Sequence, residues 1–323
     1  MAIHTPVVLP APSKTFSSRL RGGDEVAWAI TLFFALVILA ITALLVYELW
    51  TWGLPAEQKF GLGFLSSRLW NPVEDQFGAL PFIYGTVLTS FLALLISVPV
   101  GVGAAIYLSE LASPRLSNAL TFLVELLAAV PSVIFGLLAI FTLIPLMREY
   151  IAPGLKAVLG FLPIFTGPVY GVGYLTAGII LAVMTFPFII SVSREALLSV
   201  PREQREAALA LGATRWESTW QVVVPFARLG IMGSIFLGLA RALGETMAVT
   251  MVIGNDPSIH TSLFAPGYTI AAVIANEFTE ATGKVYPAAL VELGLVLFFI
   301  TIVINGLARL LIIVTAGKGS GKG

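Results

Sequence analysis

Arg241 and Glu245 are charged residues within an apolar stretch of the sequence, GLARALGETMAV at positions 238–249. A guanidinium binds phosphate or carboxylate through two parallel hydrogen bonds, so the arginine is a candidate for recognition of an anion. A carboxylate nearby would keep the site from holding an anion too tightly. The alternative is an intrahelical ion pair that only locks the fold, although the order Arg then Glu is the less favourable one for such a pair.

The helix expected around these residues carries small side chains at every fourth position: Gly230, Ser234, Gly238 and Ala242. Small residues at this spacing allow another helix to approach closely. Arg241 follows Ser234 by seven residues, nearly two turns, so it points to the same face and to the protein interior. An arginine at the centre of a membrane helix costs about 2.5–3.5 kcal/mol, which a functional role would explain.

Two further acids lie in apolar runs, where an ionisable residue is a functional candidate by default. Glu125 precedes a kink expected at Pro131, where backbone polar groups are available, and it is a candidate partner of Arg241 in a substrate pathway. Glu292 is nearer the end of a run, and we expect its side chain to reach the membrane interface.

The composition indicates a membrane protein. The 323 residues are 58% hydrophobic and 11% charged, whereas soluble domains average about 25% charged residues. Equal numbers of acidic and basic residues, 18 each, disfavour nucleic acid as a partner. The chain has no cysteine, and its histidines are His4 and His260, so the sequence suggests no metal site.

Six apolar runs are long enough to cross a hydrocarbon core of about 30 Å as helices. They lie at about 28–49, 82–109, 119–147, 174–198, 228–254 and 287–314. The expected fold is therefore all-α and integral to the membrane, a bundle of about six transmembrane helices. Segment 151–171 is too broken by proline and glycine to span, and 268–281 is a candidate short interfacial helix.

The distribution of Lys and Arg predicts the orientation, because the cytoplasmic side collects these residues. One side holds twelve of them: Lys14, Arg19, Arg21, Arg115, Arg194, Arg202, Arg205, Arg215, Arg228, Arg309, Lys318 and Lys322. The other holds five: Lys59, Arg68, Arg148, Lys156 and Lys284. Both termini and the loop around 199–227 are then cytoplasmic, and Glu110 and Arg115 are expected to be surface charges at the end of the second span.

This orientation divides the chain into five parts. They are a cytoplasmic N-terminal tail (1–27), a first transmembrane helix (28–49), an extracytoplasmic loop (50–81), a transmembrane domain (82–313) and a flexible C-terminal tail (314–323).

The densest charge lies in the cytoplasmic loop between the fourth and fifth spans, SVPREQREAALALGATRWESTWQVVVP. Pro201 suits the first turn of a helix, and Gly212 is a natural stop. Thr214 and Glu217 have the spacing of a capping box, which begins a second short helix that Pro225 is expected to end. On composition alone, these helices could also lie on the lipid headgroups.

The order of residues in this loop resembles the EAA loop of type-1 ABC importer permeases, which depend on a binding protein. The matching positions are Glu206, Ala207, Ala208, Gly212, Val222, Val224 and Pro225. The resemblance implies that the loop is a coupling helix that docks on a separate ATPase. The residues expected there are Arg205, Glu206, Ala207, Ala208, Gly212 and Arg215. The C-terminal GKGSGKG lacks the spacing of a phosphate loop, so ATP-Mg is expected in the partner ATPase alone.

Four other segments narrow the resemblance to the C-type permease of phosphate-specific ABC importers. They are 83–111, 124–136, 237–255 and the ALVELGLVLF segment that contains Leu290. The resemblance implies a bacterial-type inner-membrane protein that works with a homologous second permease, two ATPase subunits and an extracytoplasmic phosphate-binding protein. It also implies that Arg241 and Glu245 lie on the permeation route.

Other functions remain open at this point. Within the same class, the substrate could be another oxyanion such as sulfate or molybdate. A secondary transporter or channel could use the intramembrane acids to relay protons, but no convincing inverted repeat is present. An intramembrane enzyme is disfavoured, because the sequence contains no H-E-x-x-H, no cysteine and no G-x-S-x-G.

Overall fold

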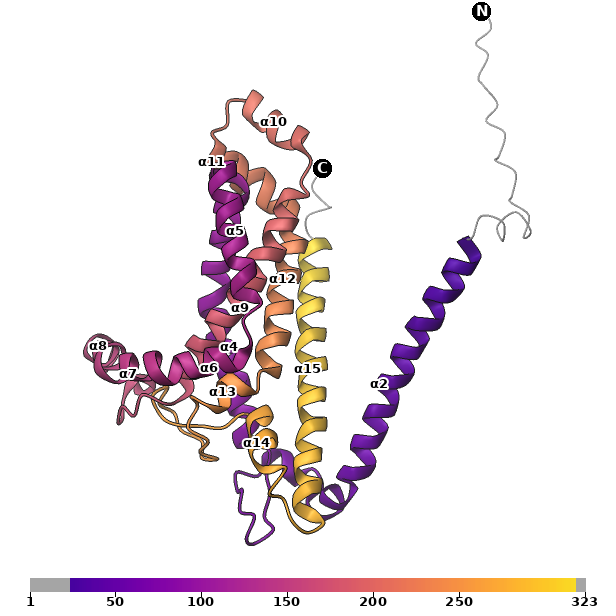
Figure 1. Cartoon of the computed structure of the whole chain (residues 1–323), viewed down its shortest axis with the longest axis vertical. Helices are drawn as coiled ribbons and strands as arrows, with labels where there is room; N and C mark the ends of the chain where they lie inside the picture. The colour runs from indigo at the N-terminus through magenta and orange to yellow at the C-terminus, as the bar shows by residue number, and fades with distance from the viewer. Residues whose placement is uncertain (1–23, 318–323) are drawn as a thin grey trace, which may run out of the picture. The chain divides into compact units, whose positions relative to one another are not determined.

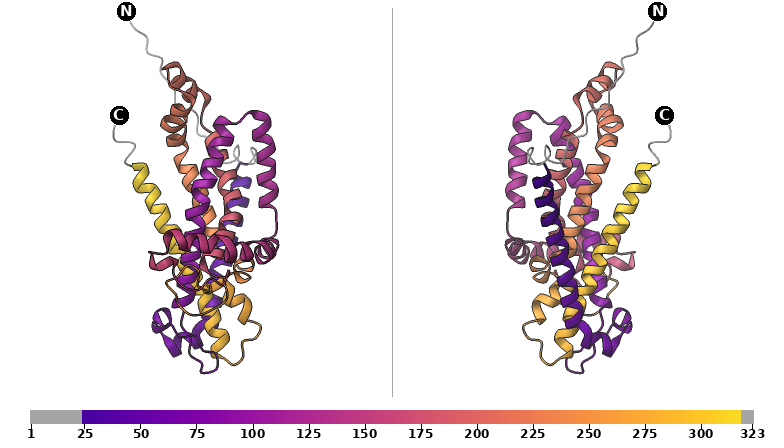
Figure 2. Two further views of the ribbon diagram at one scale, coloured as in Figure 1. Left: turned by 90° about the vertical axis from the view of Figure 1, so that its left-hand side faces the viewer. Right: turned by 90° about the vertical axis from the view of Figure 1, so that its right-hand side faces the viewer.

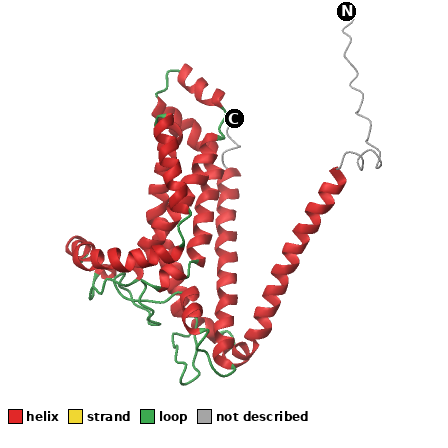
Figure 3. Ribbon diagram, viewed as in Figure 1, coloured by secondary structure: helices red, strands yellow, loops and turns green. Residues whose placement is uncertain are grey.

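A computed structural model describes residues 24–317 of the chain, with side chains for residues 25–310. The N-terminal tail to residue 23 and residues 318–323 of the C-terminal tail lie outside this range. Within it the regular structure is helical and contains no strand (Figure 3). The chain forms two compact units, residues 1–51 and 52–323, which are described separately.

Helix α2 (Asp24–Phe60) is longer than the predicted first span. Its residues to Thr51 make up the described part of the first unit. The segment from residue 50 was expected to be a loop, but α2 continues through it to Phe60. Packing stabilises this part of the helix, since Ala56 is fully buried and Phe60 contacts Phe64 and Phe77 in an aromatic cluster of the second unit. This packing outweighs the weak helix propensity of Pro55 inside the helix.

The second unit is a bundle of long helices with short ones at both ends (Figure 1). Its long helices are α4 (Leu80–Ile106, extended by a π turn Tyr107–Leu111), α5 (Pro114–Ala128), α9 (Tyr174–Leu198), α12 (Val224–Gly244) and α15 (Val285–Gly317). The short helices are α3 (Gly63–Ser66), α6 (Ser132–Leu138), α7 (Ile144–Leu146), α8 (Ala152–Leu159), α10 (Arg202–Ala210), α11 (Arg215–Ser218), α13 (Met247–Thr250) and α14 (Ile270–Glu277).

Six helices among the described residues are long and apolar enough to cross a membrane, which confirms the predicted number. The predicted third span, 119–147, is wrong as one helix. It breaks between Ala128 and Ser132, where Pro131 takes an extended backbone conformation. The chain then runs as continuous helix over Ser132–Leu159, crosswise to α4, α9 and α12 (Figures 1 and 2).

The fifth span also differs from its prediction of 228–254. It begins at Arg215 and ends at Gly244. Pro225 does not end the preceding helix, because it lies in the first turn of α12, directly after a π turn at Thr219–Val223. A π turn accommodates irregular backbone hydrogen bonding inside a helix, so the helix can continue past Pro225, which has no N–H to donate. The short helix predicted within 268–281 is confirmed as α14.

Close packing of α4, α9 and α12 forms the centre of the second unit. A Cβ built on Gly178 of α9 would lie 2.7 Å from Leu92 Cβ of α4, so the two helices meet without room for a side chain. Ser193 of α9 and Ser234 of α12 share a hydrogen bond of 2.7 Å. Gly230 and Gly238 also face α9, which confirms the predicted small-residue face of α12.

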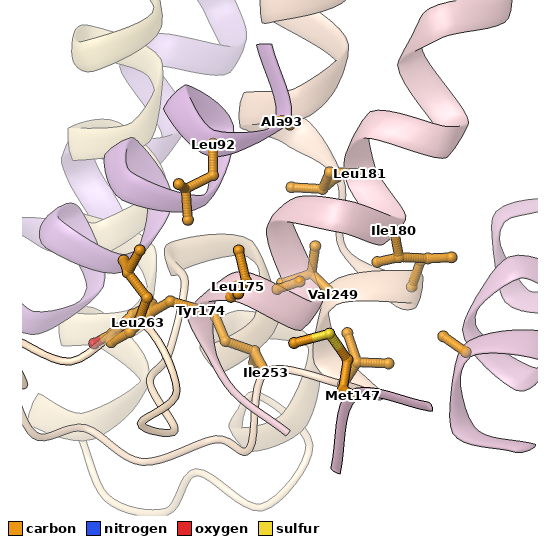
Figure 4. Close-up of a cluster of buried hydrophobic side chains, with 14 of the residues drawn as sticks. Leu92, Ala93, Met147, Tyr174, Leu175, Ile180, Leu181, Val249, Ile253 and Leu263 are labelled. Atoms are coloured by element: carbon orange, nitrogen blue, oxygen red, sulfur yellow. The ribbon is translucent and has the colours of Figure 1, made fainter. Parts of the chain in front are cut away.

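The main apolar cluster lies next to this contact and includes Leu92, Tyr174, Leu181 and Val249 (Figure 4). Its residues come from α4, α9, α12 and α13, from the helical segment Ser132–Leu159 and from the loop that precedes α14. The cluster fixes the end of α12 where Arg241 lies, since α13 follows α12 after two residues.

Candidate functional site

Arg241 lies in the last turn of α12, which ends at Gly244. The expectation that it occupies the middle of a helix is therefore wrong. Its guanidinium carbon lies 4.2 Å from the centroid of the Phe188 ring, which α9 contributes. Its Nε is buried and has no hydrogen-bond partner among the described residues. One face of the guanidinium is thus stacked on the Phe188 ring, while its Nε–H donates to no described residue.

Glu245 does not continue the helix that carries Arg241. It follows Gly244 with an extended backbone (φ −71°, ψ 126°), because α12 has ended. Its Oε1 accepts a hydrogen bond of 3.3 Å from the backbone N–H of Ala248, at the start of α13. No ion pair involving Arg241 is present among the described residues, so the alternative of an intrahelical Arg241–Glu245 pair does not hold.

Glu125 lies in the last turn of α5 and is exposed. It forms no ion pair with Arg241 in the part of the chain that the structure describes. The structure therefore brings Arg241 together with Phe188, and not with either predicted acid. The roles of Arg241, Glu245 and Glu125 in a substrate pathway remain predictions.

The loop between α9 and α12 lies at the end of the bundle where α4 ends, and it contains the predicted first short helix, α10, and the predicted glycine turn (Figure 1). The second short helix was predicted to be separate, but α11 continues through the π turn into α12. Gly212 has φ +88°, a backbone conformation that favours glycine. The capping box is confirmed: Thr214 Oγ1 accepts from the Glu217 N–H at 3.3 Å, and Glu217 Oε2 accepts from the Thr214 N–H at 2.8 Å.

A groove of about 550 Å³ lies between α10 and α11. The residues that line it are Gln204, Ala207, Ala208, Leu211, Gly212, Ala213, Glu217, Gln221 and Val222. Three of the residues expected to dock on an ATPase line the groove, namely Ala207, Ala208 and Gly212. Glu206 and Arg215 are exposed on the same loop.

Arg205, which was also expected at the docking surface, forms an ion pair with Glu110. Its Nε and Nη2 donate to the two carboxylate oxygens of Glu110, at 3.1 and 2.9 Å. Nη2 also donates to the Leu197 carbonyl at 2.7 Å, and Nη1 donates to the Val200 carbonyl. The side chain of Arg205 is 20% exposed and that of Glu110 10%, so Glu110 is not the surface charge that was expected.

Neither Phe188 nor Glu110 was predicted from the sequence to make these contacts. Phe188 lies in an apolar run where nothing distinguishes it from other aromatic residues. Glu110 is 95 positions from Arg205, and only the packing of α9 against α4 brings them together.

The opposite end of the bundle carries an ordered loop between α13 and α14. Asp256 Oδ1 accepts from the Ser258 N–H at 2.9 Å, and Oδ2 lies 3.3 Å from His260 Nε2. Tyr84 of α4 donates to the His260 carbonyl at 3.2 Å. Burial raises the pKa of Asp256, but hydrogen bonds from Ser258 and the proximity of His260 outweigh it and hold the pKa below its usual value.

Comparison with known proteins places these features in context. Residues 97–312 match the family described as "Binding-protein-dependent transport system inner membrane component". The phosphate transport system permease protein PstC of Mesorhizobium japonicum is 47% identical, over 88% of this chain and 89% of its own length. PstC of Haemophilus influenzae is 46% identical, over 87% of this chain and 90% of its own length.

Two solved structures share the fold. A bacterial ABC transporter involved in the import of the acidic polysaccharide alginate aligns with a TM-score of 0.57, covering 90% of this chain and 98% of its own, at 18% identity. The MetNI methionine ABC transporter in an inward-facing conformation aligns with a TM-score of 0.50 at 17% identity, and the alignment covers 71% of this chain and 93% of that chain. At this identity the likeness shows the fold alone.

Proposed function

The chain belongs to the family of binding-protein-dependent transport system inner membrane components, and from this membership we propose that it is the permease subunit of an ATP-driven phosphate importer. The observation that carries the proposal is the 47% identity, over 88% of the chain, to a phosphate transport system permease. The chain is a multi-pass membrane protein and a transport subunit rather than an enzyme. The membrane is the bacterial inner membrane, and both termini are cytoplasmic.

ATP hydrolysis takes place in partner ATPase subunits, which bind ATP-Mg. Two of them engage the assembly, and the loop of this chain docks on one through Glu206, Ala207, Ala208, Gly212 and Arg215. Glu206, Ala207, Gly212 and Arg215 are exposed and Ala208 is half-buried around a glycine turn, which supports this role, since small side chains let a partner surface approach. A homologous second permease completes the pathway, and an extracytoplasmic binding protein delivers phosphate.

Arg241 is the residue proposed to meet the anion. The ring of Phe188 stacks against the guanidinium, and Nε has no hydrogen-bond partner among the described residues, so donors remain for phosphate oxygens. Glu245 lies close in sequence and limits how tightly phosphate is held, and Glu125 is a second acid of the pathway. Closure of the ATPases moves the loop and alternates access to Arg241.

The test is transport by the assembled complex in liposomes, with the second permease, the ATPase and the phosphate-binding protein present. We expect radiolabelled phosphate to enter only when ATP is supplied and the ATPase is present. Sulfate and molybdate, each tested with the same complex, distinguish the other oxyanions. ATP hydrolysis without phosphate entry, together with entry of another oxyanion, would replace the proposed substrate. Uptake without any ATPase would instead favour a secondary transporter.

A further inference from the structure

We propose that Arg205 is a positioning residue that fixes the docking loop to the cytoplasmic ends of α4 and α9, so that the three move as one body. The proposal rests on the proposed function and adds how movement of the loop reaches the anion site. It also separates Arg205 from the other charged residues of the loop, which face outward.

The contacts of Arg205 join three parts of the chain. Glu110 lies in the π turn that extends α4, Leu197 is in the last turn of α9, and Val200 follows it before α10 begins. The bidentate bond to Glu110 is charge-assisted and has a defined geometry, unlike the contact of a flexible surface charge. Because both side chains are largely buried, removal of one partner leaves the other charge uncompensated.

Apolar packing reinforces the same junction. Ala105 and Ile106 of α4 form a buried cluster with Leu197, Val200, Val223 and Ala227. Val223 directly precedes α12, and Ala227 lies in its first turn. The loop therefore sits on a rigid base at both of its ends. Arg205 strengthens this base through its salt bridge with Glu110. Among the described residues, no other salt bridge joins the loop to another helix.

The base is continuous with the anion site through close helix packing. A Cβ on Gly101 of α4 would lie 2.9 Å from Ile189 Cγ2 of α9, and one on Gly238 of α12 would lie 3.1 Å from the same side chain. Ile189 thus contacts both neighbours, and the adjacent residue, Phe188, stacks on Arg241. A displacement of α10 that carries α4 and α9 with it necessarily moves the ring beside Arg241.

The first experiment measures phosphate entry and ATP hydrolysis together in the reconstituted complex, and compares Arg205→Gln and Glu110→Gln with the native chain. We expect assembly and hydrolysis to persist, while the phosphate transported per ATP falls about tenfold, within the range typical of coupling between sites. Arg202→Gln is the matched control, because Arg202 is exposed on the same helix, and its ratio should equal that of the native chain. An unchanged ratio in Arg205→Gln would overturn the proposal.

A second experiment covers the case in which these variants fail to assemble. The chain has no cysteine, so a Glu110→Cys, Arg205→Cys double variant carries thiols at these two positions alone. A short bifunctional thiol reagent then cross-links the two positions, so that a covalent link replaces the salt bridge. We expect the link to preserve or restore phosphate transported per ATP. If the link abolishes transport, the loop must separate from α4 and the proposal is wrong. Absence of phosphate uptake by the native complex would instead count against the proposed function.

Discussion

At the scale of single residues, Arg241 is placed where a positive charge is tolerated. The end of a helix carries partial negative charge, which favours a cation by about 0.3–1 kcal/mol. Stacking on an aromatic ring contributes about 0.5–2 kcal/mol more. Together these terms offset much of the cost of an arginine in an apolar bundle, without a carboxylate partner among the described residues. The Nε of the guanidinium thus has no hydrogen-bond partner among the described residues and is available to an anion.

The ring of Phe188 should matter for transport through its aromatic character. Phe188→Leu keeps an apolar side chain but removes the ring that stacks on Arg241. We expect phosphate uptake by the assembled complex to fall about twofold to fivefold, since the stacking energy is lost. Phe188→Tyr keeps the ring and should transport at close to the native rate. Equal uptake by the two variants would show that the ring has no part in holding Arg241.

The loop that contains Asp256 should lose order in acid. Because the folded-state pKa of Asp256 lies below its value of about 3.9 in an unfolded chain, its stabilising effect is present above about pH 4 and is lost as the pH falls through the folded pKa. Hydrogen exchange of residues 254–268, corrected for intrinsic rate, should therefore show protection declining below about pH 4. Asp256→Asn should remove this pH dependence, and protection that is constant down to about pH 3 in the native chain would contradict the assignment.

At the scale of elements, the contact of α4 with α9 depends on where glycine lies. A Cβ added to Gly101 would lie 2.9 Å from Ile189 Cγ2, whereas a Cβ added to Gly103 on the same helix would have nothing within 4 Å. We expect Gly103→Ala to raise thermal stability of the detergent-solubilised chain, since alanine is favoured in a helix by about 0.5–1 kcal/mol. Gly101→Ala should lower it, because Ile189 must shift. A thermal unfolding assay that ranks the two variants the other way would refute this view of the contact.

The elements that could be predicted from sequence are those with local signals. The capping box of Thr214 and Glu217, the turn at Gly212 and the small-residue face of α12 each depend on a few neighbouring residues, and each is present. The end of α12 at Gly244 was missed, because the apolar run continues past it while the packing of α13 decides the break. The pairing of Arg205 with Glu110 was missed because it depends on tertiary packing of distant segments.

At the scale of the whole molecule, the second unit presents two opposite ends. The loop with α10 and α11 lies at one end, and the loop of residues 67–79, between α3 and α4, lies at the other (Figure 1). The distribution of Lys and Arg predicts that the first end is cytoplasmic. In intact cells a membrane-impermeant maleimide should label Val73→Cys, which is 94% exposed in the native chain, and should not label Arg202→Cys. The absence of native cysteine makes both signals specific. Labelling of Arg202→Cys but not of Val73→Cys would show that the chain has the opposite orientation.

The most direct test of the account is ATP-dependent phosphate entry into liposomes that hold the assembled complex, with the native chain or with Arg241→Gln. Glutamine keeps polarity but removes the charge and the forked donors of the guanidinium. We predict that native complexes accumulate phosphate and that the variant assembles, hydrolyses ATP and accumulates almost none. Phosphate entry at the native rate in the variant would contradict the central claim that Arg241 meets the transported anion.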